Sequence, residues 1–168
     1  GPGQADGIYM RNGSRNLITN HPAIKRNTGT GVYMGFTAVS NRVIGNMVFS
    51  NGAAGVMFNS GGADGNRIAS NKVFGPGQNV GVDNADGDKN MITNNIFKRH
   101  VQTGVKVQLT GSSNWVVGNS IYSNQQTGLD VSGTGKDNRF IRNLVYRNGI
   151  RGVRVLSGTN NRFLNNDV

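Results

Sequence analysis

The sequence of 168 residues contains no cysteine and no glutamate, and only three prolines. Without cysteine, disulfide bonds cannot stabilise the fold, and cysteine usage does not reveal the redox compartment. No apolar run approaches the length that a membrane span needs. Apolar residues make up only 35% of the chain, but they recur at regular positions, which excludes a disordered chain.

Negative charge is also scarce. All eight acids are Asp, against 18 Lys and Arg, so that the net charge is +10. Such an excess favours polyanionic partners, either acidic polysaccharide or nucleic acid. The alternative is a basic surface that contacts only solvent, and composition does not decide between the two.

Glycine is abundant, with 26 residues, and it recurs with a nearly fixed period. A glycine followed by an aliphatic residue returns at intervals of 24, 24, 26, 23, 24 and 24 residues. The seven pairs are Gly7-Ile8, Gly31-Val32, Gly55-Val56, Gly81-Val82, Gly104-Val105, Gly128-Leu129 and Gly152-Val153. A period in this range is typical of stacked repeats, in which each unit buries its apolar face against its neighbours. One repeat domain is therefore predicted over residues 7–168.

Each repeat contains three short stretches of apolar or β-branched residues, separated by Asn, Gly and Ser. The stretches have the composition of strands and the separators that of turns. No segment shows helical i, i+3, i+4 periodicity over ten or more residues. We therefore predict an all-β chain folded as a single-stranded parallel β-helix, or solenoid. It has about seven coils, a period of about 24 residues and three short strands per coil.

Asparagines recur at the predicted corners, where stacked amides form asparagine ladders. The first predicted column is Asn20, Asn46, Asn71, Asn94, Asn119, Asn143 and Asn166. The second is Asn41, Asn66, Asn114, Asn138 and Asn161, interrupted by Arg15 and Lys89. The third is Asn27, Asn51, Asn124 and Asn148, with His100 in one repeat. An aromatic column follows the first ladder by three residues: Phe49, Phe74, Phe97, Tyr122 and Tyr146. All four columns are interpreted as structural.

The repeated glycine–aliphatic pairs and stretches such as Asn119–Asn124 resemble the right-handed parallel β-helices of the pectin-lyase-like superfamily. The opening residues Asp6–Met10 are similar to coils of the mannuronan epimerases of that superfamily. This resemblance covers residues 7–168 and implies a right-handed helix, a ligand lying across one sheet, and a secreted or cell-surface location. It does not define an activity, because the fold hosts lyases, glycosidases, epimerases, phage spikes and surface proteins. Residues 1–6 are expected to be a tag remnant or an N-terminal extension, and the chain a fragment of a longer protein.

One outward column is the predicted ligand surface. The aliphatic residue after each glycine points inward, so the next residue points outward. The column reads Tyr9, Tyr33, Met57, Asp83, Lys106, Asp130 and Arg154. Tyr9 and Tyr33 would offer ring faces to sugars, whereas Lys106, Asp130 and Arg154 would bind polar groups of an acidic polysaccharide. The alternative is a stack of alternating charges that stabilises strand pairing.

Catalysis is an open question at this stage. In a polyuronate lyase, Lys106 would serve as the base and Arg154 would neutralise the substrate carboxylate, and superfamily lyases often use Lys or Arg in this way. In a glycosidase, Asp83 and Asp130 would be the carboxylates, two coils apart with Lys106 between them. The Gly-His-Gly and Arg-Ile-Lys motifs of polygalacturonases and the Asp-Pro-His motif of mannuronan epimerases are absent.

Metal-binding signals are few. Asp83, Asp86 and Asp88 are oxygen ligands of the kind that Ca²⁺ prefers, although the cluster is better explained as a polar surface turn. His21 and His100 lie about three coils apart, which excludes a histidine-rich metal site. No other cofactor is indicated.

A second surface feature is a column of arginines, Arg42, Arg67, Arg139 and Arg162, which also contains Trp115. It is interpreted either as a track for a linear polyanion or as solvated surface.

The open ends of a solenoid expose strand edges, so we expect self-association through them. Three hypotheses follow: a module that binds acidic polysaccharide, derived from an epimerase or lyase; a non-catalytic, self-assembling surface, spike or assembly domain; and a nucleic-acid binder, which charge alone favours.

Overall fold

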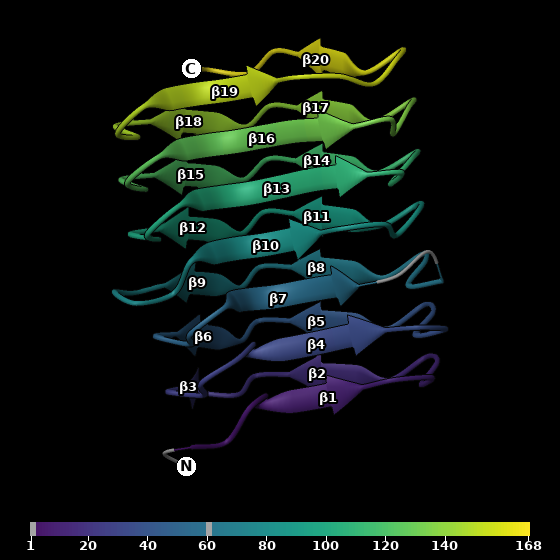
Figure 1. The fold of residues 1–168 in the computed structure, drawn as a ribbon, viewed down its shortest axis with the longest axis vertical. Coiled ribbons are helices and arrows are strands. Elements are labelled where there is room, and N and C mark those ends of the chain that lie inside the picture. The colour runs from purple at the N-terminus through teal and green to yellow at the C-terminus, as the bar shows by residue number, and fades with distance from the viewer. Residues whose placement is uncertain (1–2, 60–61) are drawn as a thin grey trace.

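The computed structural model describes residues 3–59 and 62–168, so Gly1 and Pro2 of the expected N-terminal extension lie outside the described residues. The described chain consists of strands and turns (Figure 1). These residues contain no α-helix, and hence none of the length and apolarity that a membrane crossing requires.

Three parallel sheets form the solenoid. Sheet A contains β1 (Ile8–Met10), β4 (Val32–Gly35), β7 (Ala54–Asn59), β10 (Val80–Asn84), β13 (Thr103–Leu109), β16 (Thr127–Gly133) and β19 (Arg151–Val155). Sheet B contains β2 (Leu17–Thr19), β5 (Arg42–Ile44), β8 (Arg67–Ala69), β11 (Met91–Thr93), β14 (Trp115–Val117), β17 (Arg139–Ile141) and β20 (Arg162–Leu164). Sheet C contains β3 (Ile24–Lys25), β6 (Met47–Phe49), β9 (Lys72–Phe74), β12 (Ile96–Lys98), β15 (Ser120–Tyr122) and β18 (Leu144–Tyr146).

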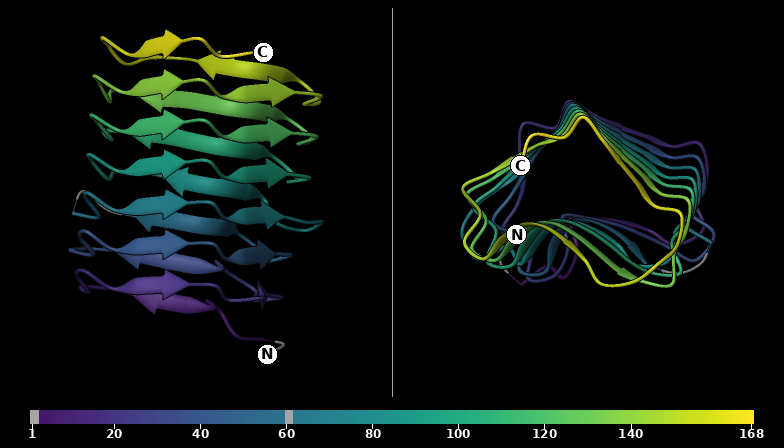
Figure 2. Two further views of the ribbon diagram at one scale, coloured as in Figure 1. Left: turned by 180° about the vertical axis from the view of Figure 1, so that it is seen from behind. Right: turned by 90° about the horizontal axis from the view of Figure 1, so that it is seen from above.

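The predicted right-handed parallel β-helix is confirmed. Each strand pairs with the equivalent strand one coil further on, for example Val32 with Val56, a step of 24 residues. Sheets A and B have seven strands each and sheet C has six, so the chain completes six turns and most of a seventh. Seen along the axis, the coils superpose on one another (Figure 2). Every outward position therefore becomes a column of side chains that runs parallel to the axis.

The interior is a continuous stack of aliphatic and aromatic side chains. From β2 to β18, each strand has at least one inward residue that is almost fully buried, as Val56, Ile68 and Val73 show for three successive strands. The recurring glycine is required beside this stack. A Cβ atom on Gly31 would lie 2.6 Å from the carbonyl oxygen of Gly55 and 2.6 Å from Val48 Cγ1. Any side chain at this corner would displace the core, which explains why the glycine recurs in every repeat.

The three asparagine ladders are present. In the first and second ladders, some members are the residue directly after the predicted one. In the first ladder, Asn95 rather than Asn94 accepts the hydrogen bond from the Asn71 backbone N–H at 2.8 Å. His21 rather than Asn20 occupies the first coil, since its backbone N–H donates to Asn46. Asn20 and Asn94 are exposed and have φ angles of 55° and 56°. They form the left-handed corner immediately before the ladder.

The second ladder is continuous, whereas the sequence predicted interruptions at Arg15 and Lys89. Those two residues adopt φ angles of 57° and 54° at the corner, and the next residues, Asn16 and Asn90, enter the ladder. Its members are Asn16, Asn41, Asn66, Asn90, Asn114, Asn138 and Asn161.

The third ladder contains a member that was not predicted. Gln78 accepts hydrogen bonds from Asn51, and its Nε2 lies 3.3 Å from Nδ1 of His100. His100 is fully buried, and burial lowers its pKa to about 3. The longer Gln side chain bridges the place where the repeat lengthens to 26 residues. His100 is therefore a neutral structural residue within a column of amides.

The aromatic column on sheet C is also corrected at one position. Phe97 pairs with Val73 and Ile121 and is buried in the core, whereas Lys98 takes the outward position between Phe74 and Tyr122. The Lys98 ammonium lies 5.7 Å from the centroid of each ring. The error has the same origin as the misplaced Asn94, a shift of one residue in this repeat.

Candidate functional site

The predicted outward column on sheet A is confirmed residue by residue. Strand pairing places Tyr9 beside Tyr33, Tyr33 beside Met57 and Met57 beside Asp83. It then places Asp83 beside Lys106, Lys106 beside Asp130 and Asp130 beside Arg154. The seven side chains consequently lie in one line along the axis, at the strand spacing of about 4.8 Å.

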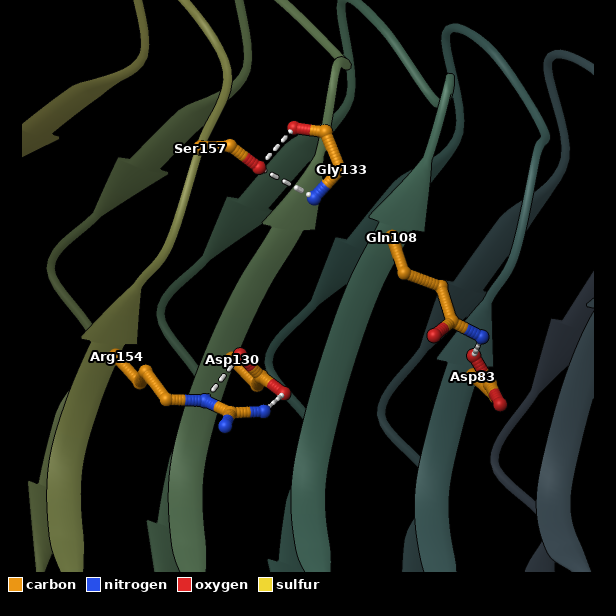
Figure 3. Close-up of polar contacts among 6 residues, drawn as sticks. All are labelled: Asp83, Gln108, Asp130, Gly133, Arg154 and Ser157. Atoms are coloured by element: carbon orange, nitrogen blue, oxygen red, sulfur yellow. Dashed lines mark hydrogen bonds and ion pairs between the residues drawn. The ribbon is translucent and has the colours of Figure 1, made fainter.

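Asp130 and Arg154 form an ion pair across neighbouring strands (Figure 3). Arg154 Nε donates to Asp130 Oδ1 at 2.9 Å, and its Nη2 donates to Oδ2, which is a bidentate geometry. Asp130 is fully buried, while the side chain of Arg154 is 34% exposed. The hydrogen bond to Asp130 raises the pKa of Arg154. The two charges neutralise each other across neighbouring strands. This is the stabilisation of strand pairing that a column of alternating charges predicts.

Asp83 lies at the other end of the charged column and is also buried. Its carboxylate accepts a hydrogen bond from Gln108 Nε2 at 2.9 Å (Figure 3). Burial raises the pKa of Asp83, and the nearby Lys106 opposes the shift. Gln108 was not among the predicted residues, although it lies two positions after Lys106 and so faces the same side of β13.

Lys106 is the cation of this column that remains available to a ligand. Among the residues that the structure describes, no carboxylate approaches its ammonium within 4.0 Å. Lys106 lines a shallow hollow together with Met57, Asp83, Asn79 and Gln102. An anionic group in this hollow would meet an unpaired ammonium beside the carboxyl group of Asp83, whose pKa is raised by burial.

The two tyrosines share one ring face, while Tyr9 stays 56% exposed. Tyr9 and Tyr33 stack on each other with ring centroids 5.0 Å apart and planes inclined by 11°. The ring of Tyr33 also lies over Gly35, and its hydroxyl accepts a hydrogen bond from Asn59. Their contribution to ligand binding stays a prediction, and it would not involve the ring faces that they share.

The acidic cluster ties neighbouring coils together. Asp86 accepts hydrogen bonds from the backbone N–H and the hydroxyl of Thr110, and Asp88 accepts one from the backbone N–H of Ser112. Over residues 3–59 and 62–168, no three His, Cys, Asp or Glu side chains gather as a metal site would require. The carboxylates that suggested Ca²⁺ thus have a structural explanation in the loops.

A second column on the outside of sheet B has a different character. Strand pairing places Arg42 beside Arg67, and Arg139 beside Arg162, with Met91 and Trp115 between the two pairs. We name these six residues the arginine stripe. All six are exposed, Met91 by 40% and Trp115 by 39%. The Arg139 guanidinium lies 4.7 Å from the centroid of the Trp115 ring.

No acid neutralises the stripe. Within the described part of the chain, the pair of Arg154 with Asp130 on sheet A is the only ion pair. Like charges directly opposite each other on neighbouring strands destabilise the pairing. Sheet A avoids such neighbours by alternating acids and bases, whereas sheet B places arginine beside arginine twice. The stripe is therefore not explained by strand stability.

The fold and these exterior columns define a parallel β-helix repeat domain with an elongated basic surface. The chain belongs to the family described as "Periplasmic copper-binding protein (NosD)", whose model matches residues 2–168. This family lies within the pectin-lyase-like superfamily that the sequence resembles. No curated protein matches the chain.

Among solved structures, the chain is similar to the Dettilon tailspike protein, with a TM-score of 0.65 and 16% identity. The match covers 90% of this chain and 40% of the tailspike chain. Likeness at this identity concerns the fold alone. The predicted resemblance to mannuronan epimerases in particular stays a prediction.

Proposed function

We propose that this chain is a binding module, located outside the cytoplasm, for a linear acidic polysaccharide. The observation that supports the proposal is that almost all basic side chains in the described part of the chain lack an acidic partner. Of 18 basic residues, only Arg154 forms an ion pair among the described residues. The remaining cations attract polyanions over the length of the solenoid. The family is described as periplasmic, which supports a location outside the cytoplasm.

Catalysis is a weaker proposal. Lys106 in its hollow remains a candidate base, but Arg154, the candidate neutralising group, is already paired with Asp130. Asp83 and Asp130, the candidate glycosidase carboxylates, are both buried. A binding role requires none of these groups to be released from its present contacts.

Copper, which the family description names, does not fit the residues that the structure describes. Copper sites use thiolate, thioether and imidazole ligands. The chain has no cysteine, and His100 is buried within a ladder. His21 shares a hollow with Met47, but no third histidine, cysteine or acid joins them.

The proposed function is tested by measuring binding of the purified chain to alginate, pectate, a sulfated glycan and single-stranded DNA at low and moderate salt. Binding to one polysaccharide that survives moderate salt would support the module. Equally weak binding to all four, abolished by salt, would reduce the basic surface to nonspecific attraction. Ultraviolet absorbance of unsaturated uronate products, followed in the same samples, would detect lyase activity.

The predicted self-association through the ends of the solenoid stays a prediction. The inward-facing Phe163 of the last strand stacks on Phe140 and is 37% exposed. Light scattering on the same preparation would show whether copies associate.

A further inference from the structure

We infer that the arginine stripe of sheet B is where the acidic polysaccharide binds, lying parallel to the solenoid axis. This inference rests on the proposed function and names the surface that performs it. It differs from the expectation that the ligand lies on sheet A.

The first argument is the order of residues along the stripe. From the N-terminal to the C-terminal end it reads Arg42, Arg67, Met91, Trp115, then Arg139 and Arg162. Two guanidinium groups therefore stand at each end of a short apolar platform. Over five strand spacings the stripe extends about 24 Å. A linear chain with regularly spaced anions can engage both arginine pairs, and a small anion only one.

The second argument is chemical fit. Each guanidinium presents a planar fork of donors that matches a carboxylate or sulfate bidentately. Arg42 and Arg67 are separated by one strand spacing, about 4.8 Å, which is comparable to the length of a sugar unit. Successive uronate groups on one chain can thus meet successive arginines.

The third argument concerns the platform between the pairs. Met91 and Trp115 line a hollow with Lys89 and Ser113. The Arg139 guanidinium covers one face of the Trp115 ring, so a sugar would contact the exposed part of the indole and Met91, with Lys89 as a further cation beside them. Single-stranded nucleic acid is held on several aromatic side chains, one for each successive base. The stripe has only one aromatic residue, which favours a polysaccharide.

The neighbouring column on sheet B is compatible with such a ligand. Two residues after each stripe residue the side chain is apolar or hydroxyl-bearing; Ile44, Val117 and Ile141 are partly exposed, whereas Ala69 and Thr93 are buried. A polysaccharide on the stripe would therefore have uncharged, partly apolar surface along one side. No carboxylate interrupts its path on these strands, because sheet B contains no acid within its strands.

The experiment uses Trp115, the only tryptophan of the chain, as a local reporter. Alginate oligomers of increasing length are titrated into the purified protein while binding heat and tryptophan emission are measured. We expect emission to change in step with the binding heat. We also expect affinity to rise steeply once the oligomer is long enough to reach both arginine pairs.

Two matched variants each remove two positive charges. Arg42→Thr with Arg67→Thr removes one arginine pair of the stripe, and Lys25→Thr with Lys72→Thr removes two exposed lysines of sheet C. The stripe variant should bind alginate about tenfold more weakly, and the lysine variant should bind within about twofold of the parent. A third variant, Lys106→Ala, reports on sheet A. Circular dichroism establishes that each variant is folded.

The outcomes separate the inference from the proposed function. If alginate binds without a change in tryptophan emission and only Lys106→Ala weakens it, the stripe is overturned while the binding function stands. If DNA rather than any polysaccharide binds at the stripe, the assignment to polysaccharide is wrong. If no polyanion binds beyond nonspecific attraction, both the function and the inference fail.

Discussion

Arg154 holds the fully buried carboxylate of Asp130 in a bidentate ion pair across β16 and β19. This contact decides how the charged column of sheet A is interpreted. One of the two predicted ligand cations is neutralised within the protein, so Lys106 alone remains unpaired in that column among the described residues.

Removing the cation of this pair should destabilise the fold. Arg154→Ala leaves the Asp130 carboxylate buried without a partner, and we expect a loss of about 2 kcal/mol in the free energy of unfolding, measured by urea denaturation. The double variant with Asp130→Asn should recover most of it. Arg162→Ala, which removes an exposed arginine without an ion pair, is the control and should change stability by less than about 0.5 kcal/mol. Equal effects of the two single variants would contradict this account.

The corrected ladder register predicts a sharp difference between two adjacent asparagines. Asn95 is buried and its side chain bonds to Asn71, Ile68 and Asn119. Asn95→Ala should therefore cost about 3 kcal/mol, because several buried partners lose their hydrogen bonds. Asn94 is exposed at a left-handed corner, and Asn94→Gly should change stability by less than about 0.5 kcal/mol. Thermal denaturation of both variants tests the assignment, and the reverse order of effects would restore Asn94 to the ladder.

His100 should make the protein less stable as the pH falls. Its pKa is about 3 in the folded protein and ordinarily 6.5, because burial disfavours the charged form. Below pH 6.5 the unfolded chain takes up a proton that the folded chain does not, so stability declines from about pH 6.5 toward pH 3. His100→Asn should flatten this slope in urea titrations at several pH values. An unchanged slope would show that other groups cause the acid sensitivity.

Asp83 should contribute in the opposite direction. Burial raises its pKa above 3.8, so the folded protein keeps a proton that the unfolded chain releases. The associated stability is present below pH 3.8 and is lost as the pH rises through the folded pKa. Asp83→Asn keeps an acceptor for Gln108 and should stabilise the protein at neutral pH, with little effect at low pH. If Asp83→Asn destabilises the protein at neutral pH, the carboxylate is ionised and engaged there.

Much of the fold could be predicted because, in a solenoid, residues one sequence period apart lie side by side on neighbouring strands. The interval of 24 residues places equivalent residues one above another, so the outward column from Tyr9 to Arg154 was predicted without error. The stripe from Arg42 to Arg162 follows from the same rule. The corners were harder. Where two ladder-competent residues are adjacent, as in Asn94 and Asn95, composition does not reveal which one adopts the left-handed conformation.

The sequence by itself determined the repeat, the strand order, the inward and outward alternation and the excess of positive charge. These follow from spacing and composition, because every coil adds the same set of positions to the same three sheets. Only the tertiary structure decided which charges are available. Burial and the reach of individual side chains commit Arg154 to Asp130 and stack one face of Tyr9 on Tyr33. Among the described residues, they leave the arginines of sheet B without an ion pair. Such contacts depend on packing in three dimensions, which periodicity does not specify.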